Sequence, residues 1–321
     1  MILGQDRAVS RFADAMRSGA LHHAWLLAGP RGVGKASFAR EATRRLLAEA
    51  AGPPIALPGI ETPDGHPIAH FLAAGSHPDY RELVRLERKE GGLARNISIE
   101  QVRSLGELFN STPFLSPWRA VVIDSADDLE ASAANALLKM LEEPPANCLI
   151  MLVAHAPGRL LPTIRSRCRR LDFQALADDA MTSILRSAAP GQGATETARL
   201  VALAGGSAGR ALDFAALDLG PLEEAATAIL REGDPSNARR SKLAQGMSGK
   251  GGAERYAAFL ALVPNLIARE ARHLDGPRRE RALDAYAQAR ETAAIARRLG
   301  LDPAVTIFQL GGVLAGVAPL P

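Results

Sequence analysis

The sequence contains little cysteine, few aromatic side chains and no long hydrophobic run. Its two cysteines, Cys148 and Cys168, cannot by themselves build a four-ligand zinc site or a disulfide framework, so we expect no zinc and no other metal centre. Aromatic residues make up 4% of the chain, which argues against a base-stacking platform for single-stranded nucleic acid. No apolar stretch is long enough to span a bilayer, and residues 1–6 lack a charged-then-apolar signal pattern. We therefore expect a cytoplasmic protein without membrane contact.

The composition is that of an ordinary globular protein. The chain has 321 residues, of which 47% are hydrophobic and 23% charged, and this length allows two or three domains. The formal net charge is +3, and the lysines and arginines are dispersed along the sequence. Charge alone therefore gives only weak support for contact with nucleic acid.

A glycine-rich segment follows the apolar run 24–28 and predicts a phosphate-binding loop. Residues 29–35 read G-P-R-G-V-G-K, which fits the G-x-x-x-x-G-K pattern through Gly29, Gly32, Gly34 and Lys35. The glycines let backbone N–H groups point into one concavity, the following helix turns its positive end toward phosphate, and Lys35 adds a charge. The alternative is a glycine-rich turn between a strand and a helix that binds no ligand.

The residue after this lysine does not suit a magnesium site. Ala36 stands where a Ser or Thr hydroxyl would hold the metal. Ser37 is a poor replacement, because one step along a helix rotates the side chain by roughly 100°. The loop therefore retains its phosphate cradle and lacks its metal ligand.

A second apolar run, 120–123, ends in Asp124, as a Walker B strand does when it delivers a carboxylate toward the metal. An active ATPase has a Glu next to polarise water, and here that position is Ser125. We interpret Asp127 and Asp128 as a turn or the start of a helix. Together with Ala36, this predicts a site compatible with ATP binding and with little or no hydrolysis.

Strand-like runs alternate with helical stretches up to about residue 173, which indicates an α/β fold with a parallel sheet. The candidate strands are 25–28, 121–124 and 149–154. Residues 51–77, rich in Pro and Gly, are interpreted as an irregular insertion, and a metal role for its histidines (His66, His70, His77) is discounted because nearby Cys and acidic ligands are sparse. Beyond residue 173 the chain is predicted to be helical, with a late apolar stripe over 256–267 that forms either core or a subunit interface.

Two longer motifs point to a family. Residues 135–145 read N-A-L-L-K-M-L-E-E-P-P, and residues 165–169 read R-S-R-C-R. Together they resemble the clamp-loader branch of the AAA+ ATPases, and within it the delta-prime family of bacterial DNA polymerase III subunits. The resemblance covers essentially the whole chain and extends to Gly4-Gln5, to residues 77–80 (H-P-D-Y) and to residues 97–103 (I-S-I-E-Q-V-R).

The resemblance implies three domains and a set of partners. They are an AAA+ P-loop core over 1–174, a small helical lid over 175–218 and a C-terminal all-helical collar domain over 219–321. The implied function is that of a mostly non-hydrolysing stator that helps load the sliding clamp on primed DNA during replication. The implied partners are the gamma or tau motor subunits and the delta subunit, with the sliding clamp and primer-template DNA reached through the assembly.

The resemblance also assigns a role to Arg167. In clamp loaders the Arg of the Ser-Arg-Cys motif reaches into the ATP site of a neighbouring subunit, so Arg167 is expected to act there in trans. A planar, permanently charged guanidinium suits this task because it can bond two phosphate oxygens. Read without the family, Arg167 and its neighbouring arginines are a solvated basic edge.

The chain departs from the motor subunits of the family at several positions. The sensor 1 segment, 153–156, reads V-A-H-A and has no hydroxyl, and Gly209 stands at the sensor 2 position with Arg210 one residue beyond. The region 51–77 lacks the four cysteines of the zinc module that many relatives carry. Two alternatives stay open: a working ATPase motor subunit, and an interaction scaffold that binds no nucleotide and whose Lys35 pairs with a carboxylate.

Overall fold

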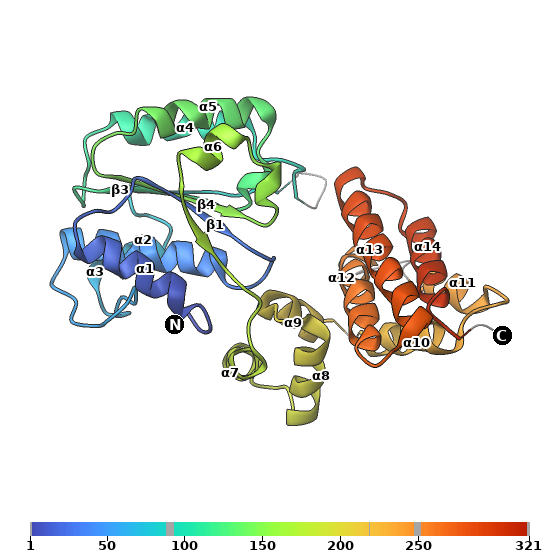
Figure 1. Cartoon of the computed structure of the whole chain (residues 1–321). Helices are drawn as coiled ribbons and strands as arrows, with labels where there is room; N and C mark the ends of the chain where they lie inside the picture. Colours follow the sequence, from blue (N-terminus) through green and yellow to red (C-terminus); the bar gives the residue numbers. More distant parts are fainter. Residues whose placement is uncertain (1, 88–92, 218, 247–251, 320–321) are drawn as a thin grey trace. The chain divides into compact units, whose positions relative to one another are not determined.

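The chain folds into two compact units, residues 1–176 and residues 177–321, in a computed structural model that describes residues 2–87, 93–217, 219–246 and 252–319 (Figure 1). The first unit is α/β and the second is helical, which confirms the predicted fold class. Residue 218, at the predicted border between lid and collar, lies outside the described residues. The division into three domains stays a prediction.

The first unit is built on a five-stranded sheet whose neighbouring strands are all parallel. The strands are β1 (Ala24–Ala28), β2 (Tyr80–Leu83), β3 (Arg119–Ile123), β4 (Cys148–Ala154) and β5 (Arg169–Asp172). Their order in the sheet is β2-β3-β4-β1-β5. The three predicted strands are confirmed as β1, β3 and β4, while β2 and β5 were not predicted.

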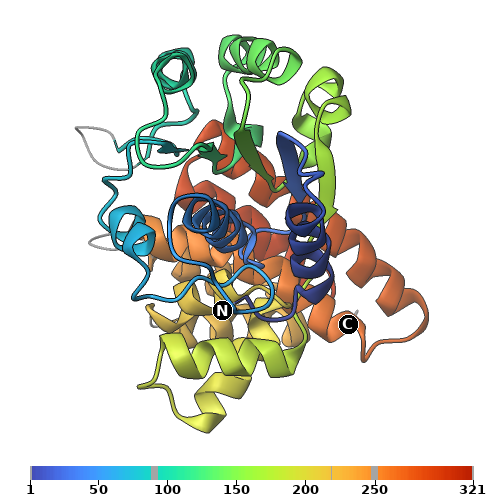
Figure 2. The same ribbon diagram turned by 90° about the vertical axis from the view of Figure 1, so that its left-hand side faces the viewer.

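Helices cover both faces of the sheet, as parallel strands require (Figures 1 and 2). Residues of α1, α2 and α3 pack on one face, and residues of α4, α5 and α6 pack on the other. The helices of this unit are α1 (Asp6–Arg17), α2 (Lys35–Ala51), α3 (Pro67–Ala73), α4 (Ile99–Asn110), α5 (Ala131–Glu142) and α6 (Pro162–Ser166), with short 3-10 helices η1 (Ala126–Asp128) and η2 (Pro157–Arg159).

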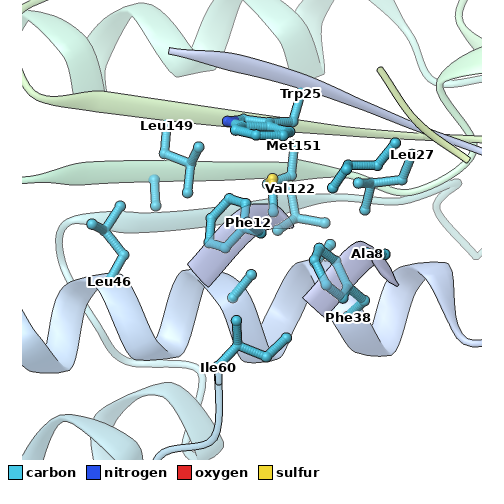
Figure 3. Close-up of a cluster of buried hydrophobic side chains, with 14 of the residues drawn as sticks. Ala8, Phe12, Trp25, Leu27, Phe38, Leu46, Ile60, Val122, Leu149 and Met151 are labelled. Carbon is cyan, nitrogen blue, oxygen red and sulfur yellow. The ribbon is translucent and has the colours of Figure 1, made fainter. Parts of the chain in front are cut away.

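Each face of the sheet has its own hydrophobic core. On the face covered by α1 and α2, Phe12 packs edge-on against Trp25 and Phe38, with ring centroids 5.2 and 5.8 Å apart (Figure 3). All three rings are fully buried. On the other face the alternate residues of β3 and β4, such as Val121 and Ile150, pack against α4 and α5. Both cores hold the sheet rigidly behind the loops at its carboxyl edge.

The insertion between α2 and β2 is more regular than the sequence indicated. The prediction of an irregular segment over 51–77 is wrong for Pro67–Ala73, which form α3. His66 is the N-cap residue of this helix, and its Nδ1 accepts a hydrogen bond from the Ile68 N–H at 3.3 Å. Arg45, buried on α2, donates to the carbonyl oxygens of Leu57 and Glu61. These bonds hold the loop between α2 and α3 against α2. In the described part of the chain, no group of three His, Cys, Asp or Glu side chains could hold a metal ion.

The second unit consists of helices alone among the residues that the structure describes. Its helices are α7 (Asp178–Ala188), α8 (Ala194–Ala204), α9 (Ala208–Ala215), α10 (Gly220–Glu232), α11 (Ala238–Gln245), α12 (Gly252–Ala271), α13 (Gly276–Leu299) and α14 (Pro303–Ala315). The predicted apolar stripe lies on α12, where Phe259, Val263 and Ile267 are fully buried, so its interpretation as core is confirmed. Within the described ranges, no helix is both long and apolar enough to cross a membrane.

Asp79, in the H-P-D-Y motif, fixes the loop that leads into β3. Its carboxylate is buried and accepts hydrogen bonds from the backbone N–H groups of Phe114, Leu115 and Ser116, at 2.8, 2.7 and 3.0 Å. A carboxylate suits this position because its two oxygens together accept all three donors. The motif therefore has a structural role at the amino end of the sheet.

We expect Asp79→Ala to lower the free energy of unfolding by about 2–4 kcal/mol, because three backbone donors lose a buried acceptor. Urea unfolding followed by the fluorescence of the buried Trp25 measures this change. Asp64→Ala is the matched control, since Asp64 lies in the preceding insertion with a fully exposed side chain, and it should leave the transition where it is. Equal effects of the two substitutions would contradict the assigned role of Asp79.

Candidate nucleotide-binding site

The predicted phosphate loop connects β1 to α2 at the carboxyl edge of the sheet. Gly32 and Gly34 have φ values of 75° and 97°, in the region that favours glycine. Gly34 is the N-cap residue of α2. Gly29 is required for a different reason, because a Cβ there would lie 2.2 Å from the carbonyl oxygen of Phe173. Its N–H donates to Ala154 O at 3.3 Å, so the loop is fastened to β4 as well.

Lys35 is buried inside this loop. Its ammonium donates to the carbonyl oxygens of Gly29 and Pro30, at 2.7 and 2.5 Å. Burial lowers the pKa of Lys35 to about 8, and the carboxylates of Asp127 and Asp124 oppose that shift. The ammonium is therefore mostly charged at pH 7 and can meet a phosphate, although it now bonds only to its own loop.

Asp124 follows β3 and lies at the same edge as Lys35. Its N–H donates to Leu83 O at 2.9 Å, which continues the pairing of β2 and β3. Burial raises the pKa of the Asp124 carboxyl, and the charge of Arg40 opposes that rise. The Arg40 guanidinium lies 3.6 Å from this carboxylate.

The residues after Asp124 turn away from the strand. Ser125 has a left-handed backbone with a φ of 66°, and its hydroxyl lies 3.1 Å from His155 Nε2. Asp127 and Asp128 form the 3-10 helix η1, as predicted for them. The Asp127 carboxylate accepts hydrogen bonds from the backbone N–H groups of His155 and Ala156, both at 3.0 Å. This carboxylate thus fixes the segment after β4 instead of serving chemistry.

The His155 imidazole is only a weak base for a reaction at neutral pH. Burial lowers its pKa to about 4, and the charge of Lys35 lowers it further. The ring is consequently neutral and paired with Ser125. The position at which a motor subunit would have a water-polarising Glu is thus part of a Ser–His contact.

The residues present do not fit a magnesium ion. Mg²⁺ requires near-octahedral oxygen ligands, and a P-loop site supplies a hydroxyl oxygen at position 36 together with the Walker B carboxylate. Here the methyl group of Ala36 packs against the hydrophobic core, and Ser37 is exposed. The remaining carboxylate, Asp124, faces Arg40.

Gln5 links the loop to the end of β5, a role the sequence did not reveal. Its side-chain amide donates to Val33 O in the loop, at 3.2 Å, and to Gln174 O, at 2.9 Å. The Gln174 N–H donates back to Gln5 Oε1 at 3.4 Å. The Gly4-Gln5 motif therefore ties the phosphate loop to the segment after β5 by hydrogen bonds.

Arg167 lies at the end of α6 and contacts neither the loop nor Asp124. Its guanidinium donates to Thr163 O at 3.0 Å and forms an ion pair with Glu142 at 2.8 Å. Glu142 belongs to the N-A-L-L-K-M-L-E-E-P-P motif, so the two long motifs are joined by this pair. In the second unit, Arg210 donates to Ala204 O at 2.9 Å, and burial lowers its pKa.

The model of a protein family described as "DNA polymerase III, delta subunit" matches residues 4–177. The chain belongs to this family. The match spans the whole sheet with the phosphate loop, Asp124 and Arg167, and it stops where the helical unit begins.

Relatives within DNA polymerase III are similar over the same part of the chain. Subunit delta' of Pseudomonas aeruginosa is 37% identical over 58% of this chain and 53% of its own length. Subunit delta' of Bacillus subtilis is 31% identical over 55% and 50%, and subunit gamma/tau of Mycobacterium tuberculosis H37Rv is 30% identical over 57% and 30%. The chain thus spans about half the length of the delta' relatives it matches. The predicted resemblance to the delta-prime family is confirmed for residues 4–177, while its extension over essentially the whole chain stays a prediction.

The lowered pKa of Lys35 makes stability depend on pH in a definite direction. Its ordinary pKa is 10.5 and its folded value is about 8, so the unfolded chain binds more protons between these values and folding gains stability as the pH rises through this window. Below pH 8 we expect Lys35→Met to raise the free energy of unfolding by about 1–3 kcal/mol, because the folded state no longer buries a charged ammonium.

This advantage should shrink between pH 8 and 10.5, where the wild-type lysine is neutral in the folded state and still protonated in the unfolded state. Urea unfolding of wild type and Lys35→Met across this pH range measures the difference between their free energies of unfolding. The contributions of all other titrating groups are the same in both proteins and cancel in this difference. A difference that stays constant with pH would contradict the assignment.

Proposed function

We propose that this chain is a clamp-loader subunit of bacterial DNA polymerase III that acts as a stator in the cytoplasm. It binds a nucleotide without appreciable hydrolysis, places Arg167 in the ATP site of a neighbouring motor subunit, and helps load the sliding clamp on primed DNA. The partners we propose are the gamma or tau motors and the delta subunit, with clamp and primer-template DNA reached through the assembly. Membership of the family and the delta' and gamma/tau relatives support this function.

The observation that carries the proposal is the placement of Arg167. Its guanidinium is partly exposed, and the contacts it makes are to Thr163 and Glu142, neither of them in the chain's own phosphate loop. An arginine held in this way is available to a second molecule. Exchanging Glu142 for a phosphate costs little, because exposed ion pairs are worth only about 0–1 kcal/mol.

The chain's own site supports a passive role. Position 36 has no hydroxyl, the residue after Asp124 is Ser125, and the neighbouring His155 is neutral at pH 7. A motor subunit would need both a metal ligand and a group that polarises water. These features disfavour the alternative of an active ATPase.

A second candidate is a scaffold that binds no nucleotide. Here the structure differs from the sequence-based version of this alternative, since the hydrogen bonds of Lys35 go to the carbonyl oxygens of Gly29 and Pro30 and not to a carboxylate. A lysine satisfied by its own loop favours the scaffold. Titration of the chain with a fluorescent ATP analogue separates the two, because a scaffold shows no saturable binding.

We expect Arg167→Ala to lower clamp- and DNA-stimulated ATP hydrolysis by the assembled loader at least about tenfold, since one transferring phosphoryl group loses its trans guanidinium. The measurement uses the loader reconstituted from this chain, the motor subunits and the delta subunit. Assembly is verified in parallel by size-exclusion chromatography.

Arg165→Ala is the matched control, because Arg165 lies two residues away on α6 and is also exposed. It should leave hydrolysis unchanged. Equal loss from both substitutions would assign the effect to a general basic edge. An assembled complex with full activity despite Arg167→Ala would overturn the trans role.

A further inference from the structure

An arginine lies beside Asp124, the carboxylate that would face the metal ion in a P-loop site. Arg40 lies on α2, five residues after Lys35, and its Nη2 is 3.6 Å from Asp124 Oδ2. Asp124 is partly buried, so its charge needs a neutralising partner. Arg40 forms an ion pair with it, and Arg31 and Lys35 add weaker attraction.

The position of Arg40 is fixed by β2. Glu82 accepts hydrogen bonds from Arg40 Nε at 2.9 Å and from Nη2 at 2.6 Å, a two-point contact that holds the guanidinium plane. Tyr80, two residues earlier on the same strand, donates its hydroxyl to Glu82 Oε2 at 3.1 Å. The arginine is therefore placed by a network that runs from Tyr80 to Asp124, and its position does not depend on a ligand.

The oxygen atoms that could bind a metal are already engaged. Position 36 presents a methyl group, the Ser125 hydroxyl contacts His155, and the Asp124 carboxylate faces Arg40. A divalent ion would have to displace the guanidinium from its contacts with Asp124 and Glu82 to reach a carboxylate. An anion would meet the backbone N–H groups of the loop, and Lys35 would reach it by exchanging its bonds to Gly29 O and Pro30 O.

We propose that this site binds the phosphate chain of a nucleoside di- or triphosphate without a divalent cation, and that Arg40 replaces the metal as the charge that offsets Asp124. The inference rests on the proposed nucleotide binding and specifies its chemistry. In a magnesium site the ion neutralises both phosphate and carboxylate. In the proposed complex Lys35 binds the phosphate, and Arg40, which is shared with Glu82, offsets part of the charge of Asp124. The carboxylate therefore keeps a cation beside it when Mg²⁺ is removed.

Titration of the full chain with a fluorescent mant-ADP probe tests this. The dissociation constant should be the same within about twofold in millimolar Mg²⁺ and in excess EDTA, because no ligand for the ion is available. Arg40→Gln should weaken binding about tenfold in EDTA, since Asp124 then repels the phosphates. Asp124→Asn in the Arg40→Gln background should recover most of this loss.

That recovery separates a charge effect from structural damage, which a second substitution would not repair. Arg44→Gln is the matched control, because Arg44 lies one turn further along α2 and pairs with Asp64 in the insertion. It should bind mant-ADP as wild type does. Circular dichroism and thermal unfolding of each variant confirm that the fold is retained.

Three results would overturn the inference. One is binding that weakens by more than about twofold when Mg²⁺ is removed, since the ion would then contribute to binding. Another is wild-type affinity in Arg40→Gln. The third is no saturable binding in either buffer, which would remove the nucleotide from this site and leave the clamp-loader role to the separate hydrolysis assay with Arg167→Ala.

Discussion

The whole site depends on the parallel arrangement of the sheet, since parallel strands bring all their carboxyl ends to one edge. β1 lies between β4 and β5, so the loop that follows it is flanked by the ends of both neighbours. Hydrogen bonds from Gly29 to Ala154 and from Phe173 to Ala28 continue the ladders beyond the strands. The phosphate loop is thus held by the sheet itself, with two buried cores behind it.

The elements most readable from the sequence are those that are buried on both faces. β1 and β4 are buried along their full length, and their uninterrupted apolar runs predicted them directly. β2 and β5 lie at the edges of the sheet and carry charged residues such as Arg81 and Arg170, which removes the apolar signal. α3 was missed because its seven residues lie among prolines and glycines that read as loop.

The candidate site was predictable in its motifs and unpredictable in its pairings. Lys35 and Asp124 follow from fixed spacings next to buried strands. Arg40 and Glu82 are 42 residues apart and meet only because β2 pairs with β3, which no local pattern encodes. The ion pair between Glu142 and Arg167 likewise joins two motifs that were recognised separately. Sequence motifs thus identified the participants, and the register of the sheet decided which of them meet.

The hydrogen bonds of Gln5 connect the phosphate loop to the segment that follows β5 and leads into the second unit. The Gln5 side chain donates hydrogen bonds to the carbonyl oxygens of both Val33 and Gln174. The backbone of Phe173 lies so close to Gly29 that a Cβ on residue 29 would not fit. The helical unit begins at residue 177, three residues after Gln174. The phosphate loop and the segment that leads into the helical unit therefore share the same hydrogen-bonding side chain, so a substitution of Gln5 loosens both at once.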